Sequence, residues 1–85
     1  GFTDATYEEA IFEGAPKVVA WLADASEDTF LLPTDKPAIS TSKLNVFRFS
    51  TGVEYVGGIT KGVTQIEFDY PPSAGLLVGL YEYQP

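Results

Sequence analysis

Turn-forming residues recur along the whole chain at short intervals. Gly and Pro cluster in "EGAPK", "LPTDKP", "STG", "GG", "TKG" and "YPPSAG". The segments between these clusters are short and rich in Val, Ile, Phe, Tyr and Thr, the residues that favour extended strands. Such a pattern is typical of an all-β protein, and we predict a small antiparallel β-sandwich or a partly open barrel of about six or seven short strands.

The length and composition favour one folded domain with a thin core. A chain of 85 residues buries only about 60 to 65% of its unfolded surface. Apolar residues make up 45% of the chain and aromatic residues 14%, which is too apolar for a disordered protein. The chain has no Met and begins with Gly. We therefore expect residues 1–85 to be a single domain, as a module or processed fragment of a larger protein.

Several strands can be placed from their side-chain patterns. The segment "KVVAWLAD" (17–24) is apolar on both faces, which predicts a central strand buried on both sides or at a module junction, with Trp21 in the core. The segments "FRF" and "VEYV" flank "STG" and predict a hairpin in which Gly52 takes positive φ. Residues 43–83 are predicted to form a four-stranded antiparallel meander. The cleanest strand is "TQIEFDY", whose predicted core face consists of Thr64, Ile66, Phe68 and Tyr70.

The N-terminal segment is compatible with two structures. Thr6 and Glu9 have the spacing of a capping box, and Gly14 and Pro16 stand where a helix would end, so a short helix over residues 7–13 is one alternative. The other is a strand that forms a hairpin with "KVVAWLAD" through the turn "EGAPK".

The charge is acidic and unevenly distributed. Twelve carboxylates and five basic residues give a net charge of −7. This argues against nucleic acid and anionic membranes, since both are bound through Lys and Arg. The longest apolar runs are also far too short for a membrane-spanning helix. Residues 1–42 carry eight acids and two bases, whereas residues 43–85 carry four and three. The nearly neutral second half is therefore the expected place of a protein contact.

The residue types argue against catalysis. The chain contains no His and no Cys, which removes the commonest general base and the thiol nucleophile. Ser40, Ser42 and Lys43 lie close together, but their spacing matches no nucleophile motif. Glu67 and Asp69 share a strand face, as solvent-facing carboxylates commonly do. We expect a protein that is not an enzyme and has no cofactor.

One acidic loop has a weak resemblance in spacing to a calcium site. Positions one, three, five and twelve of an EF-hand-length loop are occupied by Asp24, Ser26, Asp28 and Asp35. Thr29 stands where the sharp turn needs Gly, and no helices flank the loop. A different β-loop site would use Asp24, Glu27 and Asp28. A solvated acidic loop without metal is the interpretation we favour over both.

The final segment, "AGLLVGLYEYQP" (74–85), is apolar on both faces of a strand. Strand alternation places Leu76, Val78 and Leu80 on one face. The opposite face carries Leu77, Gly79, Tyr81 and Tyr83. Either both faces are covered by the domain itself, or the second row is exposed and forms a protein interface, with Gly79 allowing another backbone or ring to approach.

Arg48 and Tyr55 belong to the same candidate interface. Arg48 lies between two Phe residues, opposite the hairpin strand that holds Glu54 and Tyr55. An ion pair across the strands, or stacking of Arg48 on Tyr55, is therefore expected there. The plainer alternative is that Arg48 covers the solvent-facing side of the hairpin.

Two hypotheses for function follow. The first is a non-catalytic structural module that self-associates or docks on a larger scaffold of the virion, fibre or cell-surface type. The second is a glycan-binding β-sandwich with Tyr55, Tyr81 or Tyr83 as stacking platforms. An extracellular or virion-surface location is favoured in either case.

Overall fold

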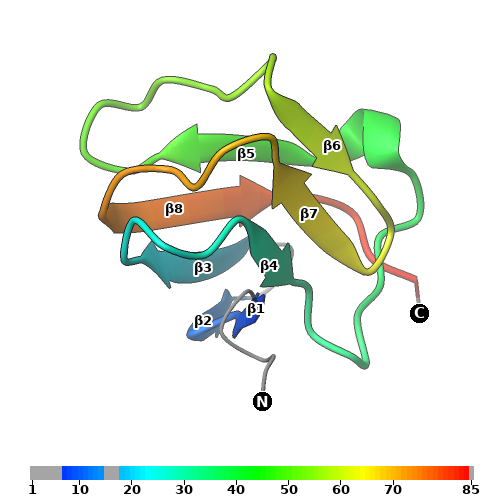
Figure 1. The fold of residues 1–85 in the computed structure, drawn as a ribbon. Coiled ribbons are helices and arrows are strands. Elements are labelled where there is room, and N and C mark those ends of the chain that lie inside the picture. Colours follow the sequence, from blue (N-terminus) through cyan, green and yellow to red (C-terminus); the bar gives the residue numbers. More distant parts are fainter. Residues whose placement is uncertain (1–6, 15–17, 85) are drawn as a thin grey trace.

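Two four-stranded sheets packed face to face make up the computed structural model, which describes residues 7–14 and 18–84 (Figure 1). Sheet A has the strand order β1-β4-β7-β6 and sheet B the order β2-β3-β8-β5. Every neighbouring pair is antiparallel except β1 and β4. The strands are β1 (Tyr7–Glu9), β2 (Phe12–Gly14), β3 (Val18–Ala23), β4 (Thr29–Leu31), β5 (Asn45–Arg48), β6 (Ile59–Lys61), β7 (Gln65–Phe68) and β8 (Gly75–Leu80). The predicted β-sandwich is confirmed, and the sheets do not close into a barrel.

The core lies between the two sheets and centres on Trp21. This residue is fully buried, and its Nε1 donates a 2.8 Å hydrogen bond to the carbonyl oxygen of Leu31, which joins sheet B to sheet A. Its ring lies 6.1 Å from that of Phe30, which in turn meets Phe68 edge to face at 5.8 Å. The predicted core position of Trp21 is confirmed. Other fully buried core side chains are Val19, Leu44, Val46, Ile66 and Leu77.

The N-terminal segment is extended, so the helix alternative is wrong. β2 pairs antiparallel with β3, as the hairpin alternative predicts, and β1 pairs in parallel with β4. A seven-residue helix is only marginally stable alone, whereas these strands extend existing sheets. Thr6 and residues 15–17, which form part of the predicted turn, lie outside the described residues.

The prediction for β7 is correct within the strand and wrong at its ends. Ile66 and Phe68 point into the core, while Glu67 is exposed. Tyr70 is 83% exposed and Thr64 is also exposed, because the strand extends only from Gln65 to Phe68.

The hairpin after β5 is confirmed, but the predicted meander is wrong. Gly52 has φ +70°, and the amide nitrogen of Arg48 donates to the carbonyl of Val53 over 3.0 Å. Beyond this hairpin, β6 and β7 belong to sheet A, while β8 returns to pair with β5 in sheet B (Figure 1). Residues 43–83 therefore supply strands to both layers, which lets them enclose one core.

Candidate protein-interaction surface

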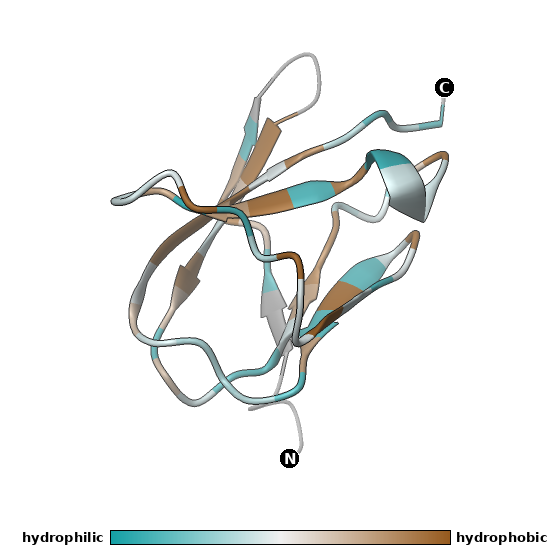
Figure 2. Ribbon diagram, turned by 90° about the horizontal axis from the view of Figure 1, so that it is seen from above, coloured by the Kyte–Doolittle hydropathy of each residue, from teal (hydrophilic) through white to brown (hydrophobic). Residues whose placement is uncertain are grey.

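The outer faces of the two sheets differ in polarity. On sheet A, the strand positions that point away from the core include Thr60, Gln65 and Glu67. On sheet B, the corresponding positions are apolar on all four strands, with Asn45 as the polar exception. Figure 2 shows apolar residues concentrated in the strands and polar residues along many of the connections. Sheet B therefore has one apolar face toward the core and a second one toward the outside.

The strand register sets this second face, which we call the outer apolar face. Phe12 lies opposite Ala20, Ala20 opposite Val78, and Val78 opposite Phe47, so one apolar row crosses all four strands. Parallel rows contain Val18 with Leu80 and Leu22 with Leu76. The outer apolar face thus consists of Phe12, Val18, Ala20, Leu22, Phe47, Leu76, Val78 and Leu80.

Several of its side chains are open to solvent. Phe12 is 53% exposed and Leu22 54%, and Phe49 beside the face is 67% exposed. Isolated exposed apolar residues are ordinary on protein surfaces, whereas a contiguous apolar patch is a candidate interaction site.

A hollow of about 460 Å³ lies in this face. Its wall includes the aromatic rings of Phe12 and Phe49, and Ala20, which is only 5% exposed, supplies a short side chain between them. The remaining lining residues are Ile11, Val18, Leu76 and Val78. Small-molecule sites usually contain a few polar groups that orient the ligand, and this lining has no polar side chain.

Polar side chains border the face. At its β5 edge, Asn45 Nδ2 donates a 2.8 Å hydrogen bond to Glu54 Oε2. Near Leu80, a second hollow of about 430 Å³ is lined partly by Lys43 and Glu82. An apolar centre with a polar rim is the usual composition of a protein–protein interface.

The prediction that the second row of the final strand is exposed is wrong, because this row faces the core. Leu77 is fully buried, Gly79 is buried, and Tyr81 is only 3% exposed. The ring that approaches Gly79 comes from Trp21 of the same domain: a Cβ at position 79 would lie 2.8 Å from its Cη2. The open row is the other one, with Leu76, Val78 and Leu80.

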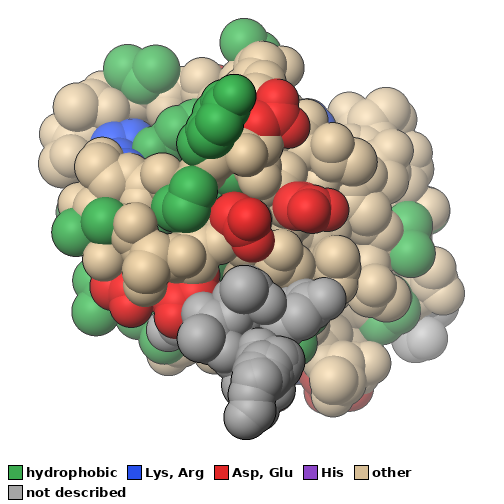
Figure 3. All heavy atoms as spheres, in the orientation of Figure 1, with side chains coloured by type: hydrophobic (Ala, Val, Ile, Leu, Met, Phe, Trp, Pro, Cys, Tyr) green, Lys and Arg blue, Asp and Glu red, His purple; other side chains and the backbone are tan. Residues whose placement is uncertain are grey.

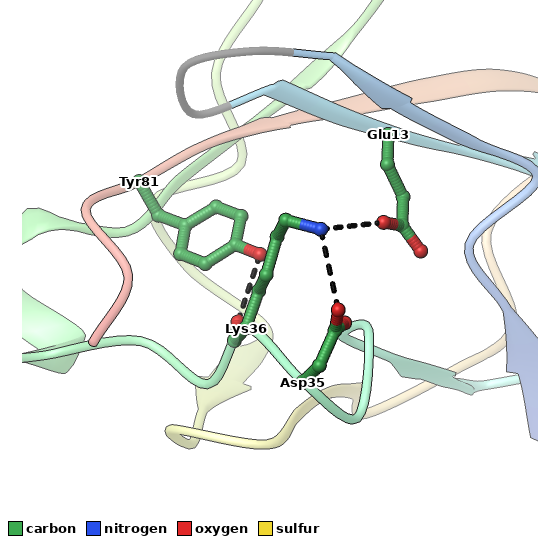
Figure 4. A network of polar contacts seen from close by, with 4 residues as sticks. All are labelled: Glu13, Asp35, Lys36 and Tyr81. Carbon is green, nitrogen blue, oxygen red and sulfur yellow. Dashed lines mark hydrogen bonds and ion pairs between the residues drawn. The ribbon is translucent and has the colours of Figure 1, made fainter. Parts of the chain in front are cut away.

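Figure 4 shows Tyr81 of the last segment beside Lys36, which precedes Ala38 in the chain. Tyr83 forms an isolated β-bridge with Ala38. The Tyr81 hydroxyl donates a 2.9 Å hydrogen bond to the carbonyl of Lys36, and burial raises the pKa of Tyr81, so the hydroxyl keeps its proton. The Lys36 Nζ lies 3.0 Å from Glu13 Oε1, and this bond raises the pKa of Lys36. The Lys36 Nζ also lies 5.9 Å from the centre of the half-buried Tyr83 ring. Tyr81 is therefore a core residue and provides no open platform for a sugar.

Arg48 and Tyr55 contact each other through a hydrogen bond and not through stacking. Arg48 Nε donates to the Tyr55 hydroxyl over 3.1 Å, and Nη2 donates to the carbonyl of Ser73 over 2.8 Å. The Tyr55 ring packs edge to face on Phe68, with centroids 5.1 Å apart. The expected ion-pair partner, Glu54, accepts a hydrogen bond from Asn45. Arg48 thus fastens the loop before β8 to β5.

The serines considered as nucleophiles have local structural contacts. Ser40 caps the 3₁₀ turn Thr41–Lys43: its hydroxyl oxygen accepts from the amide of Ser42 over 3.2 Å, and the two hydroxyls lie 2.8 Å apart. Glu67 and Asp69 are both exposed.

The acidic loop is organised by its own hydrogen bonds. Asp24 Oδ1 accepts from the amide and hydroxyl of Ser26, over 2.9 and 2.8 Å. Hydrogen bonds from the Glu27 side chain and from Ser26 hold the pKa of Asp24 well below its usual range. Asp28 Oδ1 accepts a 3.0 Å bond from the Thr29 hydroxyl. Within residues 7–14 and 18–84, no three carboxylates are grouped so that they could hold a metal ion.

The surface in Figure 3 shows acidic side chains near the middle of the face turned to the viewer, with few basic ones beside them.

Searches against protein-family models, curated protein sequences and solved structures find no match to this chain. In the part of the chain that the structure describes, no helix is long and apolar enough to cross a membrane.

Proposed function

We propose that this domain is a non-catalytic assembly module that binds another protein surface through the outer apolar face. The observation that carries the proposal is the row from Phe12 through Ala20 and Val78 to Phe47, which is apolar across four strands. Water in contact with the exposed side chains of this face, such as Phe12 and Leu22, is released when another surface covers them, and this release favours association.

The chemistry of the chain agrees with this role. With no His and no Cys in the sequence, the usual general base and the thiol nucleophile are missing. The hollow over Ala20 has no polar side chain that could orient a reacting group or a sugar hydroxyl. A protein surface with apolar side chains needs no such group.

The test is to locate the contact with a photoreactive side chain. Benzophenone–alanine placed at Leu22 probes the outer apolar face, and the same group at Thr60, exposed on sheet A, is the matched control. Irradiation of the full protein in the cells that produce it should give protein–protein adducts from position 22 and few from position 60. Adducts from position 60 alone, or none from position 22, would overturn the proposal.

A further inference from the structure

The outer apolar face offers a more specific assignment, which rests on the proposed function. We propose that its partner is a second copy of this chain, stacked sheet on sheet about a twofold axis. In such an arrangement, the same patch of each copy meets its equivalent on the other.

The dimensions of the face favour a sheet as the covering element. β3 and β8 are six residues long, β5 four and β2 three, so four strands at about 4.8 Å spacing give a face of at most roughly 20 by 15–19 Å. A helix with its side chains is about 10–12 Å wide, so a single helix would leave roughly a fifth to a half of this width uncovered. A sheet of equal size covers it completely, and stacked sheets pack about 10 Å apart.

The shape of the outer apolar face and its lack of charged side chains are compatible with binding to the same face of a second copy. Phe12 and Phe49 line the hollow and are more than half exposed, whereas Ala20 supplies only a methyl group to its lining. A twofold axis through this face can place the exposed rings of one copy against the hollow of the other, because both copies contribute the same patch. The outward positions of the four strands carry no Lys, Arg, Asp or Glu, since Asn45 is their polar member. Two chains of net charge −7 can therefore meet without placing like charges at the centre of the contact.

The size of the outer apolar face also indicates how strongly the two copies bind each other. Its projected area is at most about 300–400 Å² per copy, because β2 and β5 are shorter than β3 and β8, and this is below the roughly 800 Å² per partner of a stable interface. We therefore expect a reversible dimer with a Kd of roughly 10 µM to 1 mM.

The experiment is sedimentation equilibrium of the purified chain across this concentration range, with paired substitutions. Leu22→Glu and Leu22→Lys place opposite charges at a half-exposed position of the face, and Thr60→Glu and Thr60→Lys are the controls on sheet A. Both Leu22 variants should be monomeric and retain the wild-type circular dichroism spectrum. Both Thr60 variants should dimerise within about threefold of the wild-type Kd. Agreement between Glu and Lys would show that burial, and not net charge, controls the contact.

Two results would overturn the twofold dimer. One is a wild-type chain that stays monomeric at about 1 mM, and the other is a dimer that both Leu22 variants retain. If photoadducts to a different protein still form at position 22, the assembly function stands and only the identity of the partner is wrong. If position 22 gives no adducts, the assembly function fails as well.

Discussion

The indole ring of Trp21 lies directly over Gly79 of the neighbouring strand, where a Cβ would come within 2.8 Å of Cη2. The same ring donates its N–H to the carbonyl of Leu31 in the opposite sheet. The missing side chain at position 79 thus makes room for the largest residue of the core, and that residue fastens the two sheets together.

Gly79→Ala should therefore destabilise the domain. The added methyl group must displace the ring or the backbone, and overpacking of this kind costs about 1–3 kcal/mol of unfolding free energy. Gly57→Ala is the control, because nothing lies within 4 Å of a Cβ built there. Urea denaturation followed by circular dichroism measures the unfolding free energies of the two variants. Equal stability of the two would contradict the close packing at Gly79.

Arg48→Ala should lower stability without changing association. The guanidinium holds the carbonyls of Ser73 and Ala74 and the Tyr55 hydroxyl, and loss of these hydrogen bonds should cost about 1–2 kcal/mol. Lys43→Ala, at an exposed position, should change stability by less than about 0.5 kcal/mol. Thermal unfolding and sedimentation measure the two properties separately. If Arg48→Ala melts at the same temperature as wild type but no longer associates, the prediction is wrong and Arg48 is an interface residue.

Acid should remove the contribution of Asp24. Its pKa is lowered in the folded chain, so the folded state binds fewer protons there than the unfolded state does. The resulting stability is present above the unfolded value of about 3.9 and is lost as the pH falls toward the folded pKa. Asp24→Asn should thus be less stable than wild type near neutral pH, by a difference that shrinks below about pH 4. Urea denaturation of wild type and Asp24→Asn, near neutral pH and below about pH 4, measures the difference in unfolding free energy. If this difference is the same at both pH values, the charge of Asp24 contributes nothing to stability.

Salt should strengthen the proposed dimer. Each chain carries a net charge of −7, and the outer apolar face lacks charged side chains, so added salt screens repulsion between the copies while removing no central ion pair. The Kd measured by sedimentation should fall between about 0.05 and 0.5 M NaCl. A Kd that rises with salt would show that attraction between charged side chains, and not burial of the outer apolar face, holds the two copies together.

Local patterns in the sequence predicted local structure well. The alternation around Ile66 and Phe68 placed β7, and the residues around Gly52 placed the hairpin, because each depends on neighbours along the chain. The meander failed since pairing of β5 with β8 is decided by how two layers close on one core. The helix alternative is wrong because capping residues indicate only the local preference of a segment for a helix, and here pairing with neighbouring strands overrides that preference.

The sequence predicts an exposed row on the final strand that contains Leu77 and Tyr81, but the structure buries these two residues and leaves the opposite row of β8 more open. Both rows of β8 are apolar, so periodicity alone does not show which row faces the core. The deciding contact is nonlocal: Trp21 fits over Gly79, which turns Leu77 and Tyr81 inward. Phe12 and Ala20 were missed because their place on the outer apolar face depends on the pairing of β2 with β3.

Two adjacent residues of β8 show whether the outer apolar face lies outside the domain's own core. Leu77 is fully buried in the core, and Val78 lies on the outer apolar face. Unfolding free energies of Leu77→Ser and Val78→Ser would be measured at low protein concentration, so that association does not contribute. Leu77→Ser should cost about 3 kcal/mol or more, and Val78→Ser about 1 kcal/mol or less. Equal large costs would mean that Val78 belongs to the domain's own core, and the outer apolar face would then not be a surface available to a partner.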